Sequence, residues 1–189
     1  MRRALAIAVI MASLALAEQL SLTLLWSYQI NNTLEGIEGL AFGDNGNLGV
    51  AAGCGYIFDP RGNLLNEICD AYMHDVSYCC GRFGFVGYSL TGMYAYITND
   101  TGNLIRRIDV GVFGGNVITM IPSGFMTCGI YCGFFDFSGN MLWVRVVSAN
   151  TDPAYYNGYW YVAVPSNNKL LIIKDGSIVN EIDLSLIHI

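Results

Sequence analysis

The stretch "FDPRGNLLNEI", Phe58 to Ile68, has the pattern of a tight β-hairpin: an apolar residue, a D-P-x-G-N turn and then a pair of leucines. Pro60 presets φ for the first central residue of the turn. Gly62 can adopt the left-handed conformation that closes a type I turn with a bulge. The stretch therefore predicts two antiparallel strands joined by a turn over residues 59–63.

The same pattern returns along the chain at a nearly constant period. The words "TNDTGNLIRRI", "FDFSGNMLWVRV" and "IKDGSIVNEI" repeat it, with turn glycines spaced 40, 37 and 37 residues apart at Gly62, Gly102, Gly139 and Gly176. The segment "LLWSYQI" looks like a further copy without its turn. Five apolar pairs then fall in register: Leu24-Leu25, Leu64-Leu65, Leu104-Ile105, Met141-Leu142 and Ile178-Val179. A fixed period of this length is typical of repeat architectures.

Each period holds about four short apolar runs separated by turn residues, for example "LGVAA" and "YIF", "FGFVGY" and "MYAYI", or "YWYVAV" and "LLIIK". Four strands in about 40 residues is the strand count of a β-propeller blade. We therefore expect an all-β fold, a β-propeller of four-stranded antiparallel blades, with about four blades in an incomplete ring. The expected repeats lie near residues 31–70, 71–110, 111–148 and 149–183, within a propeller region of 18–183.

The order "apolar strand, D-x-x-G-N, apolar pair, Trp" in "FFDFSGNMLWVRV", echoed in "LLWSYQI", resembles the repeats of PQQ-like (quinoprotein-type) β-propellers. More loosely it resembles WD40 and NHL-type propellers. The likeness runs from Leu24 to about Asp183. Trp26 and Trp143 keep the tryptophan, and three other residues replace it: Asn66, Arg106 and Asn180. The resemblance implies the propeller fold, and a quinoprotein would in addition bind PQQ and Ca²⁺.

Residues 1–17 have the pattern of a secretory signal peptide, with two arginines, an apolar stretch and an A-x-A site before Glu18. Glu18 and Gln19 end the apolar run before the roughly 20 residues that a transmembrane helix needs. Removing the peptide changes the formal net charge from −6 to −8, whereas nucleic acids and anionic membranes attract basic surfaces. We expect a secreted, extracellular or cell-surface protein with no nucleic-acid partner and no transmembrane segment after cleavage.

The last six residues, "LSLIHI" at 184–189, can be encoded by the mosaic end of transposase-based sequencing libraries. We expect them to be a non-native adapter tail. The strand at 24–30 resembles the outermost strand that completes the last blade of a closed ring, yet the fourth repeat has its own outer strand. An open stack of blades would leave unpaired edges. We therefore expect the reading frame to continue beyond Asp183 with further repeats.

Six cysteines would face an oxidising compartment after export. Cys54 and Cys69 face each other across the first hairpin if its loop is even, whereas a bulged three-residue loop shifts the register by one. Cys128 and Cys132 could pair across a tight turn.

Cys79 and Cys80 form the remaining pair. The resemblance implies a vicinal disulfide, which quinoprotein methanol dehydrogenases place against PQQ. Neighbouring residues of a strand point to opposite faces, which favours pairing elsewhere or free thiols. No CxxC zinc pattern is present. Asn31 and Asn99 begin N-x-T sequons and are candidate glycosylation sites.

His188 lies in the expected tail, so His74 is the single histidine of the repeats, and it stands beside Asp75. Such a pair could do acid/base work near the propeller axis, although strand neighbours point to opposite faces. The segment "GDNGN", Gly43 to Asn47, lacks the spacing of a calcium loop and predicts a turn. We expect no metal site.

The aromatic segment "YYNGYWYVAV" is the best candidate for a binding surface, because Tyr156, Tyr159 and Trp160 could stack on a sugar or grip a peptide. Aromatic residues on both faces of this strand also fit packing between blades. We expect a binding or scaffold module for protein or glycan ligands, bound at the axial face or the loops, with no cofactor and no catalytic set. The alternative is a fragment of a PQQ-dependent oxidoreductase.

Overall fold

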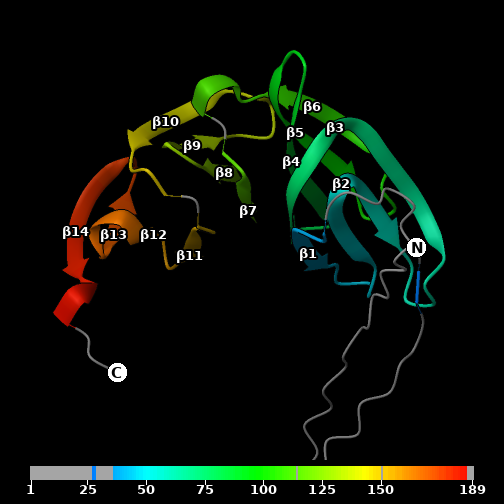
Figure 1. Ribbon diagram of the computed structural model, residues 1–189, viewed down its shortest axis with the longest axis horizontal. Coiled ribbons are helices and arrows are strands. Elements are labelled where there is room, and N and C mark those ends of the chain that lie inside the picture. Colours follow the sequence, from blue (N-terminus) through cyan, green and yellow to red (C-terminus); the bar gives the residue numbers. More distant parts are fainter. Residues whose placement is uncertain (1–26, 29–35, 114, 150, 187–189) are drawn as a thin grey trace, which may run out of the picture.

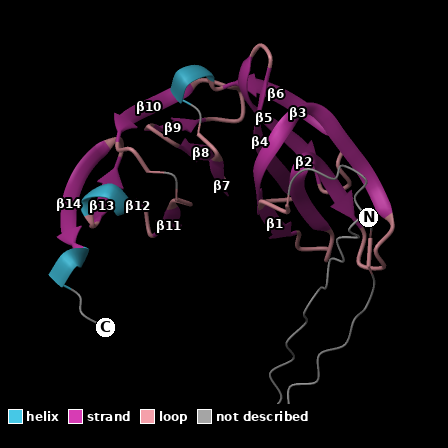
Figure 2. Ribbon diagram, viewed as in Figure 1, coloured by secondary structure: helices cyan, strands magenta, loops and turns pink. Residues whose placement is uncertain are grey.

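The computed structural model describes residues 27–28, 36–113, 115–149 and 151–186. This part of the chain contains fourteen β-strands and three single-turn 3₁₀ helices, η1 (Gly111–Phe113), η2 (Pro165–Asn167) and η3 (Leu184–Leu186) (Figure 2). None of its helices is long and apolar enough to cross a membrane. The expected signal peptide, the expected strand at 24–30 apart from Ser27 and Tyr28, and the last three residues lie outside the described residues.

The strands form three antiparallel sheets. The first sheet has six strands in sequence order: β1 (Gly39–Phe42), β2 (Leu48–Phe58), β3 (Leu64–Cys79), β4 (Arg82–Ser89), β5 (Gly92–Asn99) and β6 (Leu104–Asp109). The second contains β7 (Val117–Ile121), β8 (Gly124–Cys128), β9 (Tyr131–Phe135) and β10 (Met141–Val146). The third contains β11 (Ala154–Tyr156), β12 (Tyr159–Val164), β13 (Lys169–Lys174) and β14 (Ser177–Asp183).

The six-stranded sheet is two blades that share one long strand. The first half of β3 pairs with β2, and its second half pairs with β4. The first blade therefore ends, and the second begins, within β3. The sequence between Ile68 and Tyr72 holds no glycine or proline that would stop a strand, so β3 passes from the outside of one blade to the inside of the next.

The segments "LGVAA" and "YIF" were expected to be separate strands, but they are parts of the single strand β2. Gly53 lies between them with φ of 71°, yet it forms an irregularity in the pairing with β3 and does not reverse the chain. The reversal lies earlier, at the "GDNGN" turn between β1 and β2, where Gly43 N–H donates to the Asn47 carbonyl over 2.8 Å.

The blades follow one another around an open arc (Figure 1). β6, β10 and β14 follow its convex rim, β7 and β11 lie on its concave side, and the arc stays open between the first and fourth blades. A separate cluster of buried apolar residues fills each contact between successive blades. The structure is therefore an incomplete β-propeller of four blades.

The repeated turn closes three of the outer hairpins in the same way. Asp59 Oδ1 accepts N–H bonds from residues two and four positions on, and Asn99 and Asp136 do the same. Side-chain donation from the asparagine at the end of the turn is the largest cause of the lowered pKa of Asp59 and of Asp136. Gly62, Gly102 and Gly139 have φ between 84° and 92°, as the sequence predicted.

A bulge after each outer turn places one residue of the outer strand against the turn of the next blade. Asn66 Nδ2 donates to the Gly102 carbonyl over 2.6 Å, and Arg106 Nη1 donates to the Ser138 carbonyl over 2.8 Å. Trp143 lies against Gly176, where an added Cβ would come within 2.8 Å of its side chain. We call the contact between this residue of the outer strand and the outer turn of the next blade the clasp. One clasp occurs at each of the three successive blade contacts.

Candidate functional site

His74 and Asp75 lie where β3 enters the second blade, and the strand is bulged there. Met73 pairs with Gly87 and Asp75 with Val86, so His74 is the extra residue of the bulge. Bulges redirect side chains and are common beside functional sites. His74 reaches Glu38, whereas Asp75 reaches the third blade. The two neighbours therefore belong to different contacts and do not form a dyad.

Four side chains from three segments gather around the bulge, and we call them the His74 cluster: Glu38, Tyr72, His74 and Tyr88. His74 Nδ1 lies 2.8 Å from Glu38 Oε2, and the Tyr72 hydroxyl donates to Glu38 Oε1 over 2.6 Å. The His74 ring stacks on Tyr88 with centroids 5.3 Å apart, and Tyr72 meets it edge-on at 4.8 Å. The cluster thus holds a carboxylate and an aromatic surface in one fixed arrangement.

The cluster remains partly open to solvent. The Tyr88 side chain is 51% exposed, and Leu90, in the turn that follows, is fully exposed. The turn itself is fixed by hydroxyl contacts, since Thr91 Oγ1 lies 2.9 Å from Ser89 Oγ and 3.0 Å from the Tyr94 hydroxyl. Exposed aromatic and apolar groups on a rigid support are typical of a recognition surface.

Asp75 joins the inner strands of the second and third blades. Its Oδ2 accepts the N–H of Ile118 over 2.8 Å, and Ser77 Oγ accepts the N–H of Met120 over 3.1 Å. Side chains of β3 thereby satisfy alternate backbone donors along the edge of β7. Burial raises the pKa of Asp75 to about 7, and the Asp152 carboxylate, which exchanges a hydrogen bond with it, adds to the rise. These contacts give Asp75 a clear structural role.

The aromatic segment of the fourth blade divides between core and surface. Trp160 is only 3% exposed and packs against Phe134 and Tyr155, so it supports the contact between the third and fourth blades. The sequence left open whether this segment packs between blades or contacts a ligand, and the burial of Trp160 fits packing. Tyr156 is 73% exposed, and Tyr159 lies half-buried under the ammonium group of Lys174.

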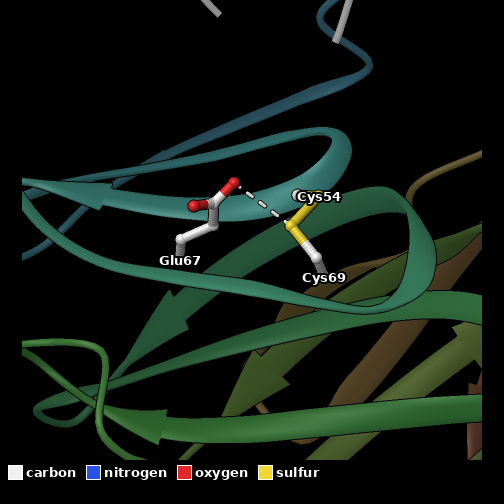
Figure 3. Close-up of side chains that lie close together, drawn as sticks. All are labelled: Cys54, Glu67 and Cys69. Carbon is white, nitrogen blue, oxygen red and sulfur yellow. Dashed lines mark hydrogen bonds between the residues drawn. A yellow bond between two sulfur atoms is a disulfide. The ribbon is translucent and has the colours of Figure 1, made fainter. Parts of the chain in front are cut away.

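Cys54 and Cys69 form a disulfide across β2 and β3. The turn pairs Phe58 with Leu64, and the bulge that follows shifts the register by one residue, which brings Cys54 opposite Cys69. The register was the uncertain point from sequence, and the bulge decides it. Glu67 Oε1 lies 3.1 Å from Cys69 Sγ (Figure 3).

In the described part of the chain, Cys54, Glu67 and Cys69 are the one group of three metal-ligand side chains close enough to share an ion. Both sulfurs belong to the disulfide, so neither is the thiolate that binds a metal. Glu67 instead contacts the Tyr56 hydroxyl. Burial, followed by the charge and hydrogen bond of Glu67, raises the pKa of Tyr56 to about 12.

The other four cysteines also form disulfides, Cys128 with Cys132 across a tight turn and Cys79 with Cys80. Strand alternation favoured opposite faces for the vicinal pair, but β3 ends at Cys79. Cys80 lies in the turn with φ of 58°, so alternation does not extend to it. Cys79 packs against the apolar cluster between the second and third blades.

The first sequon, at Asn31, lies outside the described residues. In the second, Asn99 Oδ1 accepts hydrogen bonds from the backbone of Thr101 and Asn103, so its side chain is part of the outer turn of the second blade. Glycosylation there stays a prediction.

Glu38, Tyr88 and Asp152 were missed by reasoning from sequence. Glu38 stands 36 residues before His74, and its position is fixed by an N–H bond to the Ala51 carbonyl. Nothing local in the sequence indicates that these segments meet. A sequence signal did exist for Tyr88, because it lies in the apolar strand that directly follows the strand of His74.

No known protein family and no curated protein matches the chain in sequence. Solved structures do match it. One is a Bacteroides caccae protein of unknown function, with a TM-score of 0.65, 12% identity, and coverage of 87% of this chain and 66% of that one. A second is virginiamycin B lyase from Staphylococcus aureus, solved with quinupristin, with a TM-score of 0.64, 14% identity and coverage of 85% and 60%.

A third similar structure is BBS1N in complex with ARL6DN, with a TM-score of 0.59, 10% identity, and coverage of 84% of this chain and 57% of that one. At such identities the likeness concerns the fold alone. The lyase and BBS1N are propeller-type proteins, in agreement with the blades described above. The chain spans between 57% and 66% of the length of these three structures.

Proposed function

We propose that this protein is an exported binding module that holds a protein ligand at the His74 cluster. The observation that carries the proposal is the half-exposed Tyr88 ring, which is held in place by Tyr72 and His74 and stands beside the fully exposed Leu90. A rigid aromatic residue loses little conformational entropy on binding, and such residues dominate the energetics of protein interfaces.

The charge of the surface indicates the chemistry of the ligand. Glu38 is oriented by two hydrogen bonds, and its side chain is 35% exposed, so its oxygens can still accept a bond from outside. The whole chain carries a formal net charge of −6. A partner that presents an arginine or lysine beside an apolar side chain would match both features.

Three disulfides suit a protein that works in an oxidising compartment, which supports export. The structure of BBS1N with ARL6DN is an example of a propeller-type protein bound to another protein. Both points support a binding role without identifying the ligand.

The test uses site-specific photo-crosslinking. A photoreactive amino acid is placed at position 90 of the exported protein on its native cells, and the same group at Val112, which is 75% exposed in another part of the structure, serves as the control. The partner captured at position 90 alone is purified. Its affinity for the Tyr88→Ala variant is expected to fall by at least about tenfold. Glu38→Gln is expected to weaken binding less, and Val112→Ala not at all.

The proposal is wrong if Tyr88→Ala and Glu38→Gln bind the captured partner as tightly as the unmodified protein does. A glycan array provides the second arm. Glycan binding that disappears in Tyr88→Ala, without a protein captured at position 90, would assign the site to a sugar. Circular dichroism and the Tm of each variant control for loss of folding.

The quinoprotein alternative has one observation in its favour, the vicinal Cys79–Cys80 disulfide. PQQ would have to lie against this pair with a neighbouring Ca²⁺. Cys79 is instead packed against apolar side chains, and the described residues bring no group of three acidic ligands to it. Reconstitution with PQQ and calcium tests this alternative, since an absorbance change together with dye reduction would support it.

A further inference from the structure

The outer strand of the fourth blade repeats the clasp position of the other three. Asn66 pairs with Ile57, Arg106 with Ile97 and Trp143 with Phe134, each beside a bulge in the ladder. In the fourth blade, Asn180 pairs with Ile172 beside a bulge of the same kind. Asn180 therefore stands where the first three blades place the residue that contacts the next blade.

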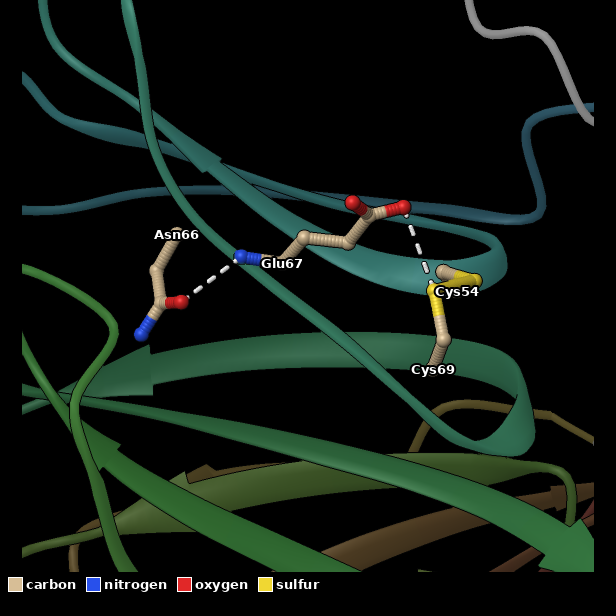
Figure 4. Close-up of a disulfide and its surroundings, with 4 residues drawn as sticks. All are labelled: Cys54, Asn66, Glu67 and Cys69. Carbon is tan, nitrogen blue, oxygen red and sulfur yellow. Dashed lines mark hydrogen bonds between the residues drawn. A yellow bond between two sulfur atoms is a disulfide. The ribbon is translucent and has the colours of Figure 1, made fainter.

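Asn180 also has the same local arrangement as Asn66. Asn66 Oδ1 accepts the N–H of Glu67 over 2.9 Å (Figure 4), which points its Nδ2 toward the Gly102 carbonyl of the second blade. Asn180 Oδ1 accepts the N–H of Glu181 over the same 2.9 Å. Among the described residues, none accepts a hydrogen bond from Asn180 Nδ2. The donor is in position, and its acceptor is not among the described residues.

The face around Asn180 is apolar and open. We call the side of a blade that points toward the next blade its far face. The far face of the fourth blade carries two cross-strand rows, Tyr161–Ile172–Asn180 and Ala163–Leu170–Ile182. The corresponding rows of the second blade are Gly84–Ile97–Arg106 and Val86–Ala95–Ile108. Ile108 is 4% exposed beneath the third blade, whereas Ile182 is 38% exposed.

We propose that the far face of the fourth blade is the docking surface for a further blade of the same polypeptide, and that Asn180 Nδ2 donates to a carbonyl in the outer turn of that blade. The occupant follows from continuity with the three existing blade contacts, which use this face and this position. A second copy of the chain fits less well. The first blade could receive Asn180 head-to-tail only on its opposite side, where Tyr28 already packs on Phe58 with ring centroids 4.8 Å apart.

The test compares two proteins, the 189-residue chain and the product of the uncut gene, by which we mean the genomic reading frame that contains residues 1–183. Asn180→Ala is introduced into both, with Asn66→Ala as the matched control, because it removes the same amide from a clasp that is already formed. Asn66→Ala is expected to lower the Tm of both proteins by roughly 2–8 °C. Asn180→Ala is expected to lower the Tm of the uncut product by a similar amount and that of the 189-residue chain by clearly less, because there it removes only the local bond from Glu181 N–H.

Three results would overturn the proposal. One is a stop codon directly after residue 183 in the uncut gene. Another is an uncut product whose Tm does not respond to Asn180→Ala while it does respond to Asn66→Ala. The third is a dimer of the uncut product that Ile172→Lys dissociates in sedimentation velocity, because the face would then bind a second copy.

Discussion

The second and fourth blades have the same strand register but different surroundings. In the second blade, apolar residues on both faces are buried, one face against the first blade and the other against the third. In the fourth, Trp160, Val162 and Leu171 are buried against the third blade, while Ile172 and Leu170 on the far face are half-buried. The two blades show that the contribution of a side chain to stability depends on the neighbouring blade, because no blade buries both of its faces by itself.

The largest expected effect comes from a matched pair of truncations, Ile97→Ala in the second blade and Ile172→Ala in the fourth. The two residues occupy the same register position, but Ile97 is 1% exposed and Ile172 is half-buried. Ile97→Ala is expected to lower the free energy of unfolding by about 2–5 kcal/mol, and Ile172→Ala by about 1 kcal/mol. Urea denaturation measures both. Equal losses would mean that the two far faces are buried alike.

The second prediction concerns the disulfide between Cys54 and Cys69, which links two strands of the first blade. Replacing Cys54 and Cys69 by alanine opens a link with a sequence separation of 15. This replacement is expected to lower the free energy of unfolding by about 3 kcal/mol, because the unfolded chain gains entropy. The matched control removes Cys128 and Cys132, with a separation of 4, and is expected to cost about 2 kcal/mol. If removing the Cys54–Cys69 disulfide lowered the free energy of unfolding less than removing the Cys128–Cys132 disulfide, loop entropy would not explain its contribution.

The third prediction concerns Asp75, which ties the second blade to the third. Its pKa rises from 3.8 to about 7, so the folded protein holds a proton there that the unfolded chain releases. The resulting stability is complete below pH 4 and is lost as the pH rises through 7. The free energy of unfolding should therefore fall by about 1–3 kcal/mol between pH 4 and pH 8. In Asp75→Asn this decline should disappear. A variant with an undiminished decline would place the titrating group elsewhere.

The fold was predictable where local chemistry decides it. Asp59, Gly62 and their repeats specify a turn within five residues, so periodic turns indicated the blades and their number. Two boundaries were not predictable. β2 runs on through Gly53, which was expected to separate two strands, because β1 and β3 pair with it on either side of that glycine. β3 runs past the expected boundary between residues 70 and 71, because β2 and β4 pair with its two halves. The register of Cys54 and Cys69 likewise depended on a bulge that no single residue announces.

The candidate site was predictable only in part. His74 was selected as the single histidine of the repeats, yet its partners come from the segment before β1 (Glu38) and from β4 (Tyr88) and meet it through a bulge. Trp160 was selected because it is aromatic, but an aromatic residue in a blade fills the contact between sheets as readily as it binds a ligand. The distinction depends on which face of the strand the next blade covers, and this is a property of the assembled sheets.

The long strand β3 has a consequence for how the molecule opens. Repeat proteins commonly unfold one unit at a time, because each unit contacts only its neighbours. A strand that is the outer edge of one blade and the inner edge of the next prevents this for the first two blades, since fraying of one removes hydrogen bonds from the other. The first half of the chain is thereby a single cooperative unit, whereas the third and fourth blades share no strand with a neighbouring blade in the described part of the chain and contact it through side chains and loops, so they can open separately. Cooperativity in this modular protein is set by one uninterrupted strand.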